Sequence, residues 1–144
     1  MHDVRVPDIL TVHLVATSAY AGFQWTVRVV AYPLLALVRA EGFARYLDAY
    51  QRRVTYLVGP LFVALALTSA GLARDREVVF VGRFASVVLF AVILSVTAWG
   101  AVPQHRRLTR GWSSDAHRRL LRADTLRVAA ATANAALAVL LVSL

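Results

Sequence analysis

The chain has 144 residues, of which 59 % are hydrophobic, and a formal net charge of +8 in which every basic side chain except histidine is an arginine. The length fits one domain, residues 1–144, and the hydrophobic fraction lies far above that of an ordinary soluble protein. The absence of cysteine excludes disulfides, thiolate metal sites and cysteine nucleophiles. The arginines gather in short connections between hydrophobic segments, which favours contacts with lipid headgroups over a nucleic-acid partner.

Four hydrophobic segments follow one another along the chain. They cover about residues 9–38, 54–72, 78–102 and 125–144, and each has the roughly 20 residues that a helix needs to cross a bilayer. The sequence therefore predicts an all-α fold, a single integral membrane domain of four transmembrane helices. Pro33, near the end of the first segment, removes a helical hydrogen bond, so we expect a kink or a break there.

Two of the connections between these segments are amphipathic. In residues 39–53, three aromatic residues recur at helical spacing among charged ones, which predicts a short helix lying in the cytoplasmic headgroup region. In the basic connection after the third segment, either Ser114 or Asp115 is expected to cap a second such helix that runs to Arg122.

The distribution of arginine predicts the orientation of the chain in the membrane. The first and third connections are rich in arginine, whereas the opposite side has Arg5, Arg74 and Arg76. By the positive-inside rule, the two arginine-rich connections face the cytoplasm and both termini lie outside. We expect a multi-pass protein of the cell inner membrane.

The first hydrophobic segment carries its polar residues on one narrow face. At 100° per residue, a single stripe on the helix holds His13, Thr17, Tyr20, Gln24 and Arg28. Ionisable groups at membrane depth are costly, so such a stripe usually faces a protein interior or a wet cavity. Two interpretations stay open: a functional pocket, and a face that only holds helices together through hydrogen bonds.

The rise of a helix places polar residues of different segments at comparable depths. Taking about 1.5 Å per residue, Gln24, Ser95 and Asn134 come near the middle of the bilayer. His13 and Arg83 lie nearer the outer edge. We therefore expect a polar column that runs through the interior of the bundle.

Two arginines are expected at similar depth near the cytoplasmic edge, together with Trp99. Arg28 and Arg127 would repel each other unless an anion or a carboxylate lies between them. The candidate carboxylates are Asp124 and Asp48. The same place would suit an acidic or enolic group of a ligand.

These residues predict a catalytic pocket. His13 or Tyr20 would move protons. Gln24 and Asn134 would orient a carbonyl group, and Arg28 would stabilise developing negative charge. The remaining residues expected to bind the substrate are Trp25, Tyr32, Ser95 and Trp99.

Neither a metal nor another cofactor is expected. His13 and His105 lie about a bilayer thickness apart, and no second histidine falls inside a hydrophobic segment. His105 and His117 belong to the basic connection, where a solvated histidine is the default expectation.

Several short motifs carry a resemblance to a known group of proteins. They are QW at 24–25, YP at 32–33, EGFARY at 41–46, YQRR at 50–53, VGP at 58–60 and VPQHRRLTRG at 102–111. In order and spacing they resemble a group of small bacterial four-helix membrane proteins, which is distantly similar to the anthrone-oxygenase-like family of aromatic polyketide biosynthesis. The resemblance implies a four-helix membrane fold and a membrane-bound biosynthetic cyclase or oxygenase.

The chain departs from that group where the group has histidines. Residues 46–50 read YLDAY in place of a YHxxH-like pattern, and Ala31 stands where a histidine precedes YP. The resemblance therefore implies metal-free chemistry for this chain.

The leading functional hypothesis is an integral-membrane enzyme that acts on a lipophilic small molecule, a natural-product intermediate of polyketide or isoprenoid type. The reaction would be a cofactor-independent cyclisation or oxygenation. The alternative is a non-catalytic membrane subunit or small transporter whose stripe packs helices, with a homo-oligomer left open. A stripe closed within one chain favours the enzyme, and a stripe on the outer surface favours the subunit.

Overall fold

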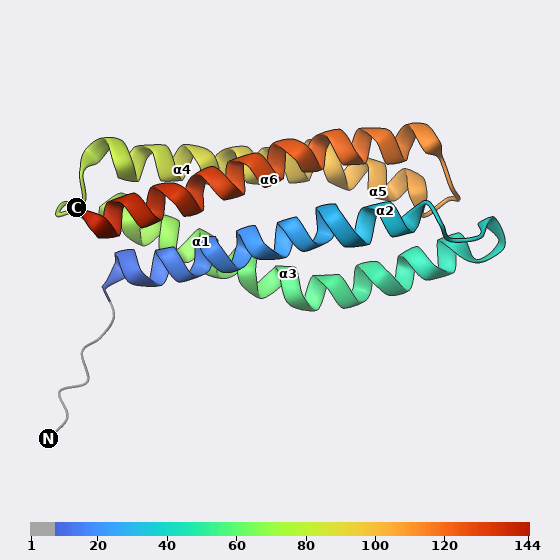
Figure 1. The fold of residues 1–144 in the computed structure, drawn as a ribbon, viewed down its shortest axis with the longest axis horizontal. Helices are drawn as coiled ribbons and strands as arrows, with labels where there is room; N and C mark the ends of the chain where they lie inside the picture. Colours follow the sequence, from blue (N-terminus) through green and yellow to red (C-terminus); the bar gives the residue numbers. More distant parts are fainter. Residues whose placement is uncertain (1–7) are drawn as a thin grey trace, which may run out of the picture.

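The computed structural model describes residues 8–144, which form a bundle of four long helical rods (Figure 1). No β-strand occurs in this part of the chain, and the predicted all-α fold is confirmed for it. The helical elements are α1 (Ile9–Thr26), η1 (Val27–Ala31), α2 (Tyr32–Leu35), η2 (Ala40–Gly42), α3 (Phe43–Arg74), α4 (Phe80–Ser95), η3 (Val96–Ala101), α5 (Val102–Leu108) and α6 (Ser114–Ser143).

The rods run alternately up and down and form a ring. The first rod is α1–η1–α2 and the third is α4–η3–α5, and neighbours around the ring are α1 and α3, α3 and α4, α4 and α6, and α6 and α1. The start of α1, the α3–α4 turn and the end of α6 share one end, which we call the terminal end (Figure 1). Residues 36–42 and 109–113 connect the rods at the other end, which we call the loop end.

Three of the rods are long and apolar enough to cross a membrane. They cover Ala40–Arg74, Phe80–Leu108 and Ser114–Ser143. The first rod, which carries the polar stripe, is not among them. Membrane association is therefore indicated by length and composition.

The two expected surface helices are instead the first turns of long rods, so this prediction is wrong. Helix α3 is continuous from Phe43 and α6 from Ser114, and the third rod continues past residue 102 to Leu108. The reason is packing: Phe43, Leu47 and Leu120 are fully buried in one apolar cluster at the loop end. These segments bury their apolar faces inside the bundle, so they extend the rods.

The N-termini of α1 and α6 are capped by side chains. The Asp8 carboxylate accepts a hydrogen bond from the backbone N–H of Thr11 at 2.7 Å, and this bond lowers the pKa of Asp8. The cap of α6 is Ser113, whose hydroxyl accepts from the N–H of Ala116, and not Ser114 or Asp115 as expected. Ser113 fits this role because its backbone is extended whereas Ser114 is already helical.

Pro33 does not break the first rod. The five residues before Tyr32 form a π-helical segment, in which the N–H of Tyr32 donates to the carbonyl of Val27, five residues back. The third rod repeats this arrangement, since η3 ends two residues before Pro103 and the N–H of Val102 donates to the carbonyl of Thr97. A proline has no N–H to donate and its ring crowds the preceding turn, so a wider turn just before it keeps the rod helical.

The π-helical segment η3 packs against α6 at Gly100, which gives a stability prediction. A Cβ atom at Gly100 would lie 2.9 Å from Cβ of Ala123, and a methyl group on a helix cannot rotate away. Gly100→Ala should therefore lower the free energy of unfolding by about 1–3 kcal/mol, measured by thermal unfolding in detergent.

Gly59 supplies the matched control, because a Cβ atom there meets nothing within 4 Å among the described residues. Gly59→Ala should keep or raise the melting temperature through better helix propensity. Equal melting temperatures for the two variants would contradict the close approach of η3 and α6.

Candidate functional site

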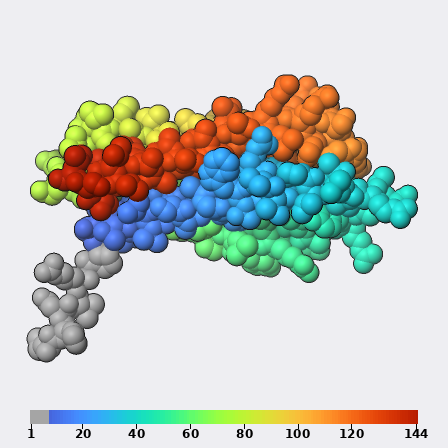
Figure 2. Space-filling view, viewed as in Figure 1, coloured from blue at the N-terminus to red at the C-terminus, as the bar shows by residue number. Residues whose placement is uncertain are grey.

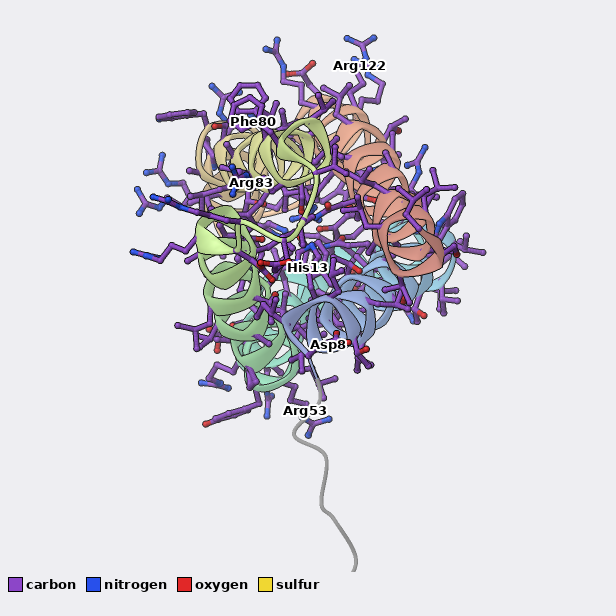
Figure 3. The ribbon with its side chains drawn as sticks, turned by 90° about the vertical axis from the view of Figure 1, so that its left-hand side faces the viewer. Asp8, His13, Arg53, Phe80, Arg83 and Arg122 are labelled. Carbon is purple, nitrogen blue, oxygen red and sulfur yellow. The ribbon has the colours of Figure 1, made fainter. Side chains whose placement is uncertain are left out.

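The polar stripe of the first rod is closed within the chain at the terminal end. His13 is fully buried between the rods, where the view from that end places it (Figure 3). Its Nδ1 lies 3.0 Å from Oγ1 of Thr68 in α3, and its Nε2 lies 2.8 Å from Oγ of Ser86 in α4. Ser86 in turn lies 2.8 Å from Oδ1 of Asn134 in α6. All four rods thus meet in one hydrogen-bonded network, which we call the terminal network.

Both nitrogens of His13 are occupied in this network. Nδ1 lies within hydrogen-bonding distance of the Thr68 hydroxyl, which also bonds the carbonyl of Ala64 at 2.8 Å, and Nε2 lies within hydrogen-bonding distance of the Ser86 hydroxyl. None of the described cavities has His13 in its lining. The terminal network therefore holds the rods together and presents no free histidine nitrogen to a ligand.

A cavity of about 440 Å³ lies towards the loop end. It is bounded by both π-helical turns, because the residues of the two wide hydrogen bonds, Val27 with Tyr32 and Thr97 with Val102, all line it. Most of its wall is apolar. The other lining residues are Phe23, Gln24, Tyr50, Gln51, Val54, Thr55, Val58, Phe62, His105, Arg106, Thr109 and Arg127.

Tyr32 is the centre of the polar end of this cavity. Its hydroxyl oxygen lies 3.1 Å from Nη2 of Arg127 and 3.2 Å from Nε2 of His105. Nδ1 of His105 lies 3.1 Å from the amide nitrogen of Gln51. An amide nitrogen only donates, so Nδ1 accepts and the ring proton is on Nε2, directed at the tyrosine oxygen.

The Tyr32 oxygen therefore accepts two hydrogen bonds, and its own proton is left for a third partner. With the ring proton of His105 on Nε2, no hydrogen bond from this hydroxyl to another acceptor is found among residues 8–144. The two donors, one of them a cation, would stabilise the negative charge that forms when the hydroxyl gives up its proton. This geometry suits a proton donor to a ligand oxygen.

Arg127 is held in place by a buried ion pair. Its Nη2 lies 2.6 Å from Oδ1 of Asp124, and the carboxylate side chain is fully buried. Of the two carboxylates considered for the space between Arg28 and Arg127, Asp124 bonds Arg127, whereas Asp48 pairs with Arg52 on the surface. A carboxylate so placed fixes the guanidinium against Tyr32.

Two polar atoms of cavity-lining residues have no partner in the described part of the chain. Gln24 is fully buried and donates through its amide nitrogen to the Tyr20 hydroxyl at 2.7 Å, but its Oε1 accepts from no described residue. Nε of Arg127 is likewise left without an acceptor there. Buried polar atoms are normally paired, so these two, like Oδ2 of Asp124 beside them, are exceptions at the polar end of the cavity.

The structure brings only part of the predicted site to this cavity. Gln24 and Tyr32 line it, while Tyr20 is buried against Phe62 with its ring edge-on and touches the site through Gln24. His13 and Asn134 belong to the terminal network.

The other predicted residues lie elsewhere. Trp25 and Arg28 line an outer recess between α1 and α6, and Ser95 is half-buried without lining any described cavity. Trp99 is 79 % exposed on the outer surface. For Arg28 in η1 and Trp99 in η3 the physical reason is the π-helical turn, which holds an additional residue, so residues within it leave the face that an ideal 100° wheel assigns. Trp25 follows Gln24 directly in α1 and so lies about 100° around the helix from it.

Sequence reasoning missed His105 and Gln51, because the segments that carry them were expected in loops or surface helices. A usable signal was present, since Ala101 and Leu108 are buried and seven residues apart, as on one face of a continuing helix. His117, expected in solvent, is buried as well and bonds the carbonyl of Tyr32 at 2.9 Å, which caps the end of the first rod.

The chain was compared with protein-family models, with curated proteins and with solved structures, and none of them matches it. Among residues 8–144, no group of three or more histidine, aspartate or glutamate side chains is placed to hold a metal ion. The function is therefore argued from the site itself.

The buried ion pair gives the second prediction. Asp124→Asn should lower the free energy of unfolding by about 3–5 kcal/mol, because it leaves the Arg127 charge buried without its counter-charge. Asp48→Asn, which breaks an exposed pair at the same end, is the matched control and should change stability little. Thermal unfolding in one detergent compares the two.

A double variant separates charge from packing. Asp124→Leu combined with Arg127→Met should recover most of the lost stability, since neither charge then remains buried. An Asp124→Asn protein as stable as the control would show that the pair is not desolvated.

Proposed function

We propose that the chain is an integral-membrane enzyme that binds a lipophilic carbonyl or enol compound in the cavity at the loop end and performs acid–base chemistry on it. The observation that carries the proposal is the Tyr32 hydroxyl, which lies 3.1 Å from Nη2 of Arg127 and 3.2 Å from Nε2 of His105 in a mostly apolar cavity. A concave apolar site with a few convergent polar groups is the usual form of a small-molecule site.

In the proposed reaction Tyr32 donates its proton to the carbonyl oxygen of the ligand while water takes the proton from the α-carbon, whose C–H electron pair becomes the enol double bond. The proton released to water then returns to the Tyr32 oxygen. Arg127 and His105 stabilise the tyrosine oxygen while it carries negative charge. Gln24 accepts a hydrogen bond from a hydroxyl of the ligand through its unpartnered Oε1. Cyclisation through such an enol needs no cofactor, whereas an oxygenation would also take up dioxygen. A polyketide- or isoprenoid-type intermediate has the required lipophilicity and carbonyl groups.

This proposal places proton transfer at Tyr32 and gives His13 a structural role. The alternative of a non-catalytic packing subunit is favoured by the terminal network alone, in which four rods share one set of hydrogen bonds. It does not account for the cavity or for the unpartnered atoms of Gln24 and Arg127. A transport path is disfavoured because the terminal network closes that half of the bundle.

The proposed chemistry can be tested with 2-tetralone, a lipophilic bicyclic ketone whose α protons exchange with D₂O through its enol. Protein in nanodiscs should accelerate this exchange over empty nanodiscs, measured by mass spectrometry. Tyr32→Phe should reduce the acceleration by about 10²-fold or more, because the proton donor is lost. Tyr46→Phe, on an exposed tyrosine at the same end, is the matched control and should have no effect.

His13→Gln separates this proposal from the sequence-based hypothesis. It should lower the melting temperature, since it removes a hydrogen bond that joins three rods, and leave the exchange rate unchanged. Loss of exchange in His13→Gln without loss in Tyr32→Phe would move the chemistry back to the terminal network.

We also propose that the loop end faces the cytoplasm of a cell inner membrane, with both termini outside. Arginine is concentrated at that end, and the positive-inside rule relates this asymmetry to orientation. Reporter fusions after Arg76 and after Leu144 should be active outside the cell membrane, and a fusion in residues 109–113 should be active inside. A cytoplasmic C-terminus would reverse the orientation.

A further inference from the structure

A second recess, of about 650 Å³, lies on the outside of the bundle between α1 and α6. These helices run side by side on the face that Figure 2 shows. The recess shares no lining residue with the cavity at Tyr32. It is lined by Trp25, Arg28, Thr125, Val128, Ala129, Thr132, Ala133 and Ala136.

Arg28 is the one charged residue of this recess, and its charge is not balanced by the described residues. Asp124 lies within electrostatic reach of both Arg28 and Arg127, but its carboxylate is bonded to Arg127. In the described part of the chain Arg28 forms no ion pair. Two cations therefore share one carboxylate at this depth, and a second anion would balance them.

The position of Arg28 matches the headgroup level of a bilayer. It is seven residues before Leu35, where α2 ends, or about 10 Å from the loop end along the helix. The long arginine side chain can cover much of that distance towards the headgroups. The loop end also carries most of the exposed arginines, and their positive charge attracts anionic lipids to the leaflet at that end.

The rest of the recess has the shape and polarity of an acyl-chain site. Ala129, Ala133 and Ala136 lie on one face of α6 and leave a shallow channel that runs from Arg28 towards the terminal end. Trp25 forms its wall, and its indole is fixed by a hydrogen bond of 3.0 Å from Nε1 to Oγ1 of Thr132. The indole N–H is thus satisfied within the protein, and the exposed ring face is left for an apolar partner.

We propose that this recess binds one anionic phospholipid of the leaflet at the loop end, with its phosphate on Arg28 and an acyl chain in the alanine channel beside Trp25. The lipid supplies the counter-charge that Asp124 cannot give to both arginines. The proposal is independent of the chemistry at Tyr32, because the two sites are lined by different residues.

The test uses Trp25 as a reporter in a protein with Trp99→Phe and Trp112→Phe, reconstituted in phosphatidylcholine bilayers. Phosphatidylglycerol with brominated acyl chains, added at a low mole fraction, should quench Trp25 as if it were enriched about five-fold over its bulk fraction. Brominated phosphatidylcholine should quench only in proportion to its bulk fraction. A protein that keeps only Trp99, which is exposed on the outer surface, is the matched control and should show no preference.

The charge of Arg28 is tested in the same Trp25 protein. Arg28→Gln should abolish the preference for the anionic lipid, and Arg28→Lys should retain most of it, with the melting temperature confirming that both variants fold. Excess inorganic phosphate should leave the quenching unchanged.

Three results would overturn the proposal. Equal quenching by the two lipids, or a preference that survives in Arg28→Gln, would show that no anionic lipid binds at this arginine. Loss of the preference on adding inorganic phosphate would assign the site to a free anion. Protection of Trp25 from both lipids would show that a second copy of the chain covers the recess.

Discussion

Two prolines that cannot donate a backbone hydrogen bond set the shape of the loop half of the bundle. Before Pro33 and before Pro103 the rod widens into a π-helical segment, and the residues of both wide turns line the same cavity. Proline alone does not require such a turn, because α3 runs through Pro60 as an α-helix. The wide turns occur in the two rods that lie diagonally across the ring, and the space they leave between them is the cavity.

The polar residues of the first rod differ in how completely they are hydrogen-bonded, and the difference depends on the residues around them and not on residue type. At the terminal end, His13 meets a hydroxyl group from each of two other rods, so the cost of burying it is offset by hydrogen bonds. Near the wide turns, Gln24 is equally buried but only one end of its amide is bonded. Close packing of the rods thus pairs His13 fully, whereas Gln24, eleven residues further along the rod, keeps one amide atom without a partner.

The helical content and the number of rods could be predicted from the lengths of the hydrophobic segments, because a run of about 20 apolar residues is typical of a helix that spans a bilayer. The counter-charge of Arg127 was also predictable, since a buried arginine requires a carboxylate and Asp124 lies one helical turn away. The positions of Arg28 and Trp99 were not, because an ideal helical wheel assumes a constant angle per residue. A π-helical segment changes that angle, and a single sequence shows the proline but not the turn that precedes it.

The role of His105 depends on a boundary that hydrophobicity alone places too early. The basic residues after Val102 lower the hydropathy, so hydrophobicity ends the segment there, yet the backbone stays helical to Leu108. These additional helical turns place His105 beside the end of the first rod, where its Nε2 lies 3.2 Å from the Tyr32 hydroxyl. Arginine-rich helix extensions of this kind combine an interfacial surface with a buried inner face, and sequence methods detect only the first.

The cavity at Tyr32 opens sideways between α3 and the third rod. Helix α3 packs closely on α4 but not on α5. The residues that line the cavity include the exposed Thr55 from α3 and the exposed Val102 and Arg106 from α5. In the proposed membrane orientation this opening faces the lipid of the cytoplasmic leaflet. A lipophilic ligand would then reach Tyr32 from the bilayer without crossing water, in keeping with the mostly apolar wall of the cavity. The polar groups of such a ligand would contact Gln24 and Arg127 only at the inner end of that path. The unpartnered atoms of these two residues would therefore add binding free energy only for a ligand that enters the cavity completely.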